Sequence, residues 1–162
     1  DGGTAYAAAI TSVKRGKSGT PGQLIGSLNA AQPIGSLYKN TVQGVFGQAD
    51  THFRGTQLPV GKAEDIRCAD ATILCTVTGN SPREYSVKIL KIYPKSRAGG
   101  RNLLLKITDP DLLATTGGIV QGMSGSPLVQ DGKLIGAVTH VLVNDPTMGY
   151  GIFIENMLDA AA

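Results

Sequence analysis

Strict alternation of apolar and polar residues is the feature that most limits what this chain can fold into. In the segment EYSVKILKIY (84–93), Tyr85, Val87 and Ile89 stand at every second position, with polar residues such as Ser86 between them. A period of two puts alternate side chains on opposite faces of a strand, whereas a helix repeats every 3.6 residues. The segment is therefore predicted to be a half-buried strand.

The rest of the chain also divides into short strand-like runs separated by turns. Two further runs are ATILCTVT (71–78), closed by the turn sequence GNSP, and RNLLLKIT (101–108), stopped by Asp109-Pro110. Shorter candidates, all before residue 50, are AYAAAITSV, QLIGSL, IGSLY and TVQGVF. Asp131-Gly132 between apolar runs predicts a two-residue hairpin turn.

Helix signals are confined to PDLLATTGG (110–118), which ends in glycines, and to IENMLDAAA (154–162). Many short strands, glycine turns and a short C-terminal helix predict an all-β fold, for which a barrel or a pair of barrels is the best match. A length of 162 residues fits one domain or two small lobes that share a site.

Composition excludes several classes of protein. The net charge of +3 is mild and only 5% of residues are aromatic, so a nucleic-acid partner is not expected. No apolar run approaches the length of a membrane-spanning helix. Cys68 and Cys75 have no second pair and no histidine beside them, so two thiols on or near a strand are favoured over a zinc site or a disulfide. We find no metal, nucleotide or organic cofactor motif and expect no cofactor.

The sequence GMSGSP places Ser124 between Gly122 and Gly125. A serine nucleophile needs a base within reach and donors for the oxyanion that forms. The glycines allow a tight curl in which the N–H groups of Gly122 and Ser124 point into one space, the predicted oxyanion hole. The alternative is a polar turn before a strand. Ser126 is the second candidate for the nucleophile, but it already enters that strand.

The order of segments after this loop resembles the C-terminal barrel of trypsin-like serine proteases. There a Gly-x-Ser-Gly-x-Pro loop is followed by a hairpin, a strand that lines the substrate cleft, a glycine-containing strand and a closing helix. The resemblance implies that Thr139, His140 and Val141 line the cleft, where their main chain would pair with an extended peptide.

A longer stretch, KITDPDLLATTGGIVQGMSGSPLVQDGKLIGAVTHVLVNDPTMGYGIFIENML (106–158), resembles the SpoIVB peptidase family of spore-forming bacteria, as do ITSVKRGKSGTPG and GVFG upstream. The resemblance implies a serine endopeptidase with a trypsin-like double β-barrel and a Ser/His/Asp triad. It assigns the nucleophile to Ser124 and the acid to Asp109. One peptidase domain over residues 1–162 is expected, with an N-terminal barrel region over about 1–100 and the nucleophile-bearing barrel over about 101–162.

The catalytic histidine of the family lies in a Gly-His motif upstream of the strand expected at TAYAAAITSV, and this sequence starts after that motif. We therefore expect the base outside this chain and the N-terminal barrel to be incomplete. His52 is the alternative base, because the order His52, Asp109, Ser124 is the trypsin order. His140 sits in the apolar run GAVTHVLV and is expected in the cleft wall.

Asp109 has a second interpretation. Asp-Pro-Asp is typical of a helix start, so Asp109 can cap the helix that Pro110 begins. Only 15 positions separate Asp109 from Ser124, fewer than in trypsin, so the acid would approach the histidine from a different part of the fold. Asp111 is the residue most easily confused with it.

The family resemblance also implies a location and partners. Its proteins carry a PDZ domain before the peptidase domain and are exported into the space between the mother-cell and forespore membranes. They cleave themselves and a membrane-embedded regulatory partner, which activates a late sigma factor. The alternative function is an inactive peptide-binding or self-associating module, because the base lies upstream. An incomplete barrel leaves an open strand edge, which favours a homodimer or a segment swap.

Overall fold

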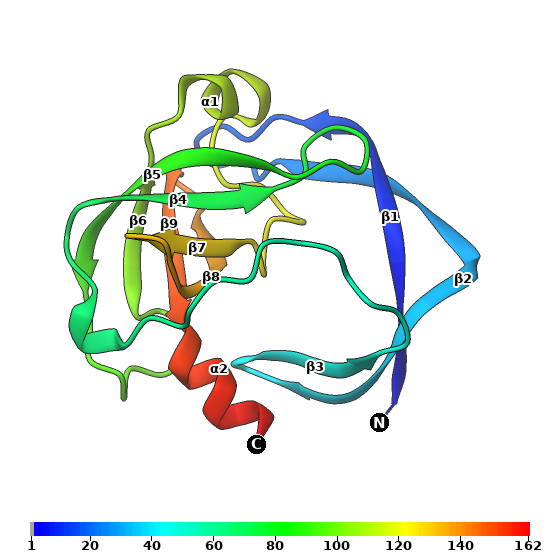
Figure 1. Cartoon of the computed structure of the whole chain (residues 1–162). Helices are drawn as coiled ribbons and strands as arrows, with labels where there is room; N and C mark the ends of the chain where they lie inside the picture. Colours follow the sequence, from blue (N-terminus) through cyan, green and yellow to red (C-terminus); the bar gives the residue numbers. More distant parts are fainter. Residues whose placement is uncertain (1) are drawn as a thin grey trace.

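The computed structural model describes residues 2–162 and consists mainly of antiparallel strands (Figure 1). The strands are β1 (Gly3–Lys14), β2 (Gln23–Thr41), β3 (Gly44–Ala49), β4 (Asp70–Cys75), β5 (Arg83–Ile92), β6 (Leu103–Ile107), β7 (Pro127–Gln130), β8 (Lys133–Leu142) and β9 (Asp145–Phe153). The helices are the short 3-10 turn η1 (Ala63–Asp65), α1 (Pro110–Thr116) and α2 (Ile154–Ala161).

Six strands form a closed barrel in the order β4-β5-β6-β9-β8-β7. Pairing of Thr72 with Val129, between β4 and β7, closes it. The alternation expected in β5 is confirmed, because Tyr85, Val87 and Ile89 are buried and the residues between them are exposed. Their side chains join the core inside the barrel. Since the sheet closes on itself, this part of the chain is a rigid base for the loops at its ends.

The first three strands form a separate sheet in the order β1-β2-β3. Its surface is largely exposed, and Phe46 is its one buried large apolar residue within residues 2–49. It meets the barrel through single bridges, Ile10 with Gly79 and Gln23 with Gln121. The structure thus has one closed barrel and one open sheet, which confirms the all-β, double-barrel expectation with an incomplete N-terminal barrel and a short C-terminal helix.

The sheets divide at a different place from the expected boundary near residue 100. Strands β4 and β5 belong to the barrel that carries Ser124, so the division falls in the segment between Ala49 and Asp70, which is exposed through residue 60. QLIGSL and IGSLY, expected as two strands, form one long strand, β2. TVQGVF, expected as a strand, is the tip of the β2–β3 hairpin, with a turn at Val42 and Gln43. Tertiary pairing decided each of these points.

Local signals were accurate at the turns and helix ends. Asp131 and Gly132 both have positive φ, 51° and 72°, in the predicted hairpin turn between β7 and β8. Helix α1 begins after Asp109 and ends at Gly117 in the left-handed conformation. Cys68 and Cys75 are free thiols, as expected. Between residues 2 and 162, every helix is too short or too polar to span a bilayer.

Candidate active site

Ser124 lies on an exposed loop between α1 and β7 that is fastened to the barrel on both sides. Met123, immediately before it, is buried in the core, and Gly125 N–H donates to the carbonyl of Val138 at 2.8 Å. Ser126 N–H donates to the carbonyl of Met123 at 3.0 Å, which closes a tight curl around the serine. Ser124 is therefore exposed to solvent, while the residues on both sides of it are fixed to the barrel.

The backbone donors expected for an oxyanion hole are available. Gly122 has a φ of +100°, a conformation that side chains rarely adopt. A Cβ added there would lie 3.1 Å from the Cβ of Leu24, because the start of β2 packs against this loop. Within residues 2–162, neither the N–H of Gly122 nor that of Ser124 donates to another protein group. Both donors are free to bind an oxygen that carries negative charge.

A cavity of about 510 Å³ opens beside Ser124. Strand β8 contributes Ala137, Val138, Thr139 and His140 to its walls. Two of the three expected cleft residues, Thr139 and His140, thus share a cavity with the serine. The tip of the β2–β3 hairpin, residues 41–45, and Met157 of α2 form the opposite walls.

The backbone of β8 beyond Ala137 has a strand neighbour on one side only. Pairing of β8 with β7 reaches Ala137 opposite Pro127, whereas pairing with β9 continues through His140 and Val141. On the other edge Val138 is still bonded to Ser126 and Gly125 of the serine loop, and no strand within residues 2–162 pairs with that edge from Thr139 onward. An unpaired edge next to a nucleophile can accept an extended peptide as an added strand.

The hydroxyl of Ser124 donates to the carbonyl of Thr139 at 3.1 Å. Thr139 in turn donates through Oγ1 to the carbonyls of Gly100 at 2.6 Å and Tyr150 at 3.2 Å, which fixes this wall of the cleft. No hydrogen bond between an imidazole and the serine occurs in the described part of the chain.

The two histidines occupy different positions. His140 lines the serine cavity, and its Nδ1 lies 2.9 Å from Thr139 Oγ1. Partial burial lowers the pKa of His140, and the positive charge of Arg101 lowers it further. His52 is exposed in the segment after β3 and is not among the residues that line the cavity.

Asp109 caps helix α1. Its Oδ1 accepts from the N–H groups of Asp111 at 3.0 Å and Leu112 at 3.1 Å, and its Oδ2 accepts from Ser86 N–H at 3.2 Å. Partial burial acts to raise the pKa of Asp109, but the hydrogen bonds from Leu112, Ser86 and Asp111, with the charge of Arg83, hold it below the usual value. Asp109 is outside the lining of the serine cavity. Asp111 is exposed and 4.0 Å from Arg83.

The family model of the SpoIVB peptidase S55 matches residues 1–158, nearly the whole chain. This chain belongs to the SpoIVB peptidase S55 family. It is therefore a serine peptidase domain, as the GMSGSP loop and the segments after it had suggested. Among curated proteins, none matches the chain.

The crystal structure of the Rv3671c protease in its inactive form has a similar fold, with a TM-score of 0.56 and 15% sequence identity. The similarity covers 94% of this chain and 86% of that one. At this level of identity the comparison supports the fold alone. It agrees with a trypsin-like double-barrel architecture for this member of the S55 family.

The site also includes residues that sequence reasoning missed. The hairpin tip, residues 41–45, and Met157 border the serine cavity although they are far from Ser124 in the sequence. Met157 approaches the hairpin, since a Cβ at Gly44 would lie 3.3 Å from its Cε. The glycine at the end of TVQG was a turn signal that could have placed a hairpin there, but nothing local indicated which surface the hairpin faces.

Proposed function

We propose that this chain is the nucleophile-bearing part of an endopeptidase that cleaves protein substrates through an acyl-enzyme. Ser124 Oγ attacks the peptide carbonyl, and the N–H groups of Gly122 and Ser124 bind the oxyanion. Donors of this kind contribute about 3–4 kcal/mol each in comparable enzymes. The proposal rests above all on an exposed serine in a glycine-built loop whose two backbone donors are free.

The proton of Ser124 would pass to an imidazole outside residues 2–162, in the Gly-His motif that the family resemblance implies. That imidazole would then protonate the leaving amine, and water would hydrolyse the acyl-enzyme. Asp109 would orient the imidazole. Its pKa lies below the usual value for an aspartate, so it is ionised at neutral pH. The two carboxylate oxygens accept three backbone hydrogen bonds, and a carboxylate has about four acceptor positions, so one position is left for an imidazole N–H.

The biological setting that we propose follows from the family. The enzyme would act in sporulation, exported into the space between the mother-cell and forespore membranes. Its substrates would be a membrane-embedded regulatory complex and, by autocleavage, its own chain. Cleavage would start the signalling that activates a late sigma factor. The proposal includes no nucleic acid and no cofactor.

A second function is favoured by one observation. The Ser124 hydroxyl donates to the Thr139 carbonyl rather than to an imidazole. On its own, the chain would then bind extended peptides along the free edge of β8 without cutting them. The open sheet has exposed apolar side chains, including Tyr6, Ile25 and Leu28, and could hold a second copy.

The decisive experiment compares Ser124→Ala with Ser126→Ala in a polypeptide that also carries the Gly-His motif. Cleavage of that polypeptide by itself, or of an added unfolded protein, is followed by mass spectrometry. Endopeptidase activity predicts complete loss in Ser124→Ala and near-normal cleavage in Ser126→Ala. Undiminished cleavage by Ser124→Ala would rule out the assignment.

A further inference from the structure

Two tyrosines on the outside of the barrel hold three cations next to the serine cavity. Tyr93 follows β5 and Tyr150 lies in β9, and their rings are tilted at 54° with centroids 6.4 Å apart. Arg97 Cζ lies 3.7 Å from the Tyr93 centroid and 5.8 Å from that of Tyr150. Lys91 Nζ is 5.0 Å from the Tyr93 ring, and Arg101 Cζ is 5.8 Å from the Tyr150 ring. We call Lys91, Arg97 and Arg101 the cationic patch.

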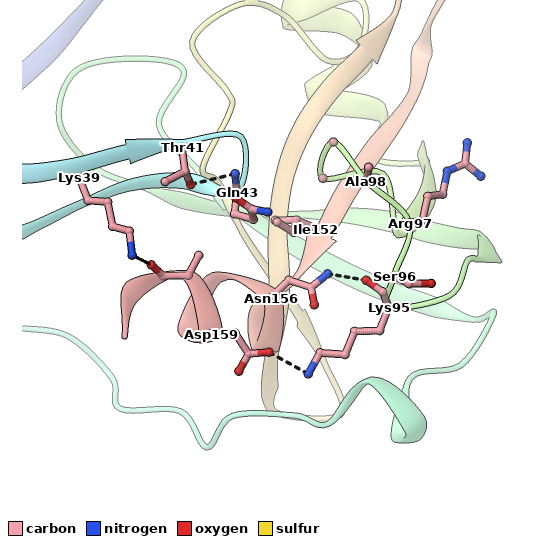
Figure 2. A pocket seen from close by; sticks show the side chains of 13 residues that line it. Lys39, Thr41, Gln43, Lys95, Ser96, Arg97, Ala98, Ile152, Asn156 and Asp159 are labelled. Carbon is pink, nitrogen blue, oxygen red and sulfur yellow. Dashed lines mark hydrogen bonds and ion pairs between the residues drawn. The ribbon is translucent and has the colours of Figure 1, made fainter.

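Within residues 2–162, no salt bridge neutralises the charge of the cationic patch. The salt bridges found in residues 2–162 take their cations from Lys62, Arg67, Arg83, Lys95 and Lys133. Lys95 is close in sequence to Arg97 but pairs with Asp159 at 3.1 Å. Figure 2 shows the Arg97 guanidinium extending away from that ion pair. The faces of the tyrosines position the patch, while the N–H groups at the edges of its guanidinium groups stay available.

The cationic patch lies beside the site of the nucleophile. Arg101 Cζ lies 5.8 Å from the Tyr150 ring, and Tyr150 pairs with His140 across β8 and β9. Arg97 lines a second cavity, of about 550 Å³, which shares Thr41, Gln43 and Ile152 with the serine cavity. The two hollows therefore adjoin at the tip of the β2–β3 hairpin.

We propose that the cationic patch binds an acidic segment of the protein substrate, a stretch with Asp or Glu close to the bond that is cleaved. This inference rests on the proposed function for its substrate. A peptide carboxylate fits the patch because a guanidinium held over a ring presents two parallel N–H groups to it, a geometry that a hydrated lysine lacks. A peptide that follows the free edge of β8 passes His140, whose strand partner Tyr150 holds Arg101 over its ring.

The test separates binding from catalysis by using a Ser124→Ala parent. A fluorescent peptide with four consecutive glutamates between apolar residues is titrated by anisotropy against the same peptide with glutamines. We expect the glutamate peptide to bind about tenfold more tightly at low salt, a preference that two charge-assisted hydrogen bonds readily supply. Added salt should reduce the preference, since charges on a surface are screened.

The variant Arg97→Gln/Arg101→Gln should abolish the preference. The matched control is Lys88→Gln/Lys106→Gln, which removes the same charge from two exposed lysines paired across β5 and β6. The control should keep the preference. Arg97→Lys keeps the positive charge but loses the two parallel N–H groups of the guanidinium, so it should retain only part of the preference for the glutamate peptide. This variant provides the test if the double variant does not fold.

Three outcomes would overturn the inference. These are equal binding of the two peptides by the parent, equal losses in the two double variants, and tighter patch-dependent binding to vesicles containing phosphatidylserine than to the glutamate peptide. The proposed function fails on a different result, namely undiminished cleavage by the Ser124→Ala variant. A glutamate preference in the binding assay is independent of that result.

Discussion

The hydroxyl of Ser124 donates its hydrogen bond to the carbonyl of Thr139, 3.1 Å away on the neighbouring strand. In a Ser/His/Asp triad, this proton passes to an imidazole. The serine loop, its free backbone donors and the free edge of β8 are thus present in residues 2–162, while no imidazole there is hydrogen-bonded to the serine. Reactivity and structure of the site can therefore be tested separately.

Ser124 should be unreactive in the isolated chain and reactive when a base is supplied. A fluorophosphonate should label residues 1–162 only slowly, because the free backbone donors act there without a base. In a polypeptide that includes the Gly-His motif, the rate of labelling at Ser124 should rise by several orders of magnitude. Removing the histidine of a triad lowers the reaction rate by a factor of that size. Peptide mass spectrometry identifies the labelled residue.

The same assay decides the role of His52. We expect His52→Ala to leave the labelling rate unchanged, because the residue is exposed and outside the lining of the serine cavity. If the isolated chain is labelled rapidly and His52→Ala removes this reactivity, His52 is the base and the upstream histidine is not needed.

Gly122→Ala should lower kcat strongly and change the free energy of unfolding to a smaller degree. The added Cβ meets Leu24 at 3.1 Å and disfavours the φ of +100°, so the loop shifts and its N–H leaves the oxyanion position. Loss of one such donor lowers kcat by about 10²–10³-fold. Gly79→Ala is the control, because φ there is +64° and open space surrounds the new methyl group. A Gly122→Ala enzyme with normal kcat would contradict the assigned oxyanion hole.

Asp109→Ala should destabilise the fold more than Asp109→Asn does. Alanine removes the acceptors of three backbone N–H groups, whereas asparagine retains a capping oxygen. Loss of a helix cap costs about 1 kcal/mol in unfolding free energy, which lowers Tm by about 2–4 °C in a chain of this size. Thermal unfolding measures both. A fall in kcat for Asp109→Asn, measured at a temperature where the variant is fully folded and absent in Asp111→Asn, would support the family role of Asp109 as the catalytic acid.

The contribution of Asp109 to stability should disappear in acid. Its pKa is lower in the folded protein than the usual value of about 3.9. The ionised form therefore stabilises the fold at pH values above the unfolded pKa, and this stabilisation is lost as pH falls through the lower, folded pKa. The difference in unfolding free energy between wild type and Asp109→Asn should shrink from pH 6 to pH 3 in denaturant titrations. A constant difference would contradict the assignment.

The two cysteines should differ in reactivity. Cys75 is buried, and burial, assisted by the negative charge of Asp109, raises the pKa of its thiol to about 11. Cys68 is exposed. Since the thiolate is the reactive form, iodoacetamide at pH 8 should modify Cys68 and leave Cys75 intact until the protein unfolds. Cys68→Ser should remove the reaction in the native state, and modification of native Cys75 would show that the barrel opens.

The sequence by itself determined the features that depend on neighbouring residues. The alternation of Tyr85, Val87 and Ile89, the turn at Asp131-Gly132 and the cap at Asp109 follow from backbone geometry within a few positions. The serine loop belongs to the same class, since Gly122 and Ser124 form the curl from adjacent residues. Resemblance to a family added the expected function, which local chemistry alone left open.

Only the tertiary structure decided which distant segments meet. The pairing of Thr72 with Val129 closes the barrel, so the barrel begins at β4 and not near residue 100. The tip of the β2–β3 hairpin borders the serine cavity. The same holds for Arg97 and Arg101, which come from a connecting loop and lie over Tyr150 beside the cleft. Strand pairing between distant segments depends on the complementarity of whole surfaces and on chain closure, and no short window of sequence contains both partners.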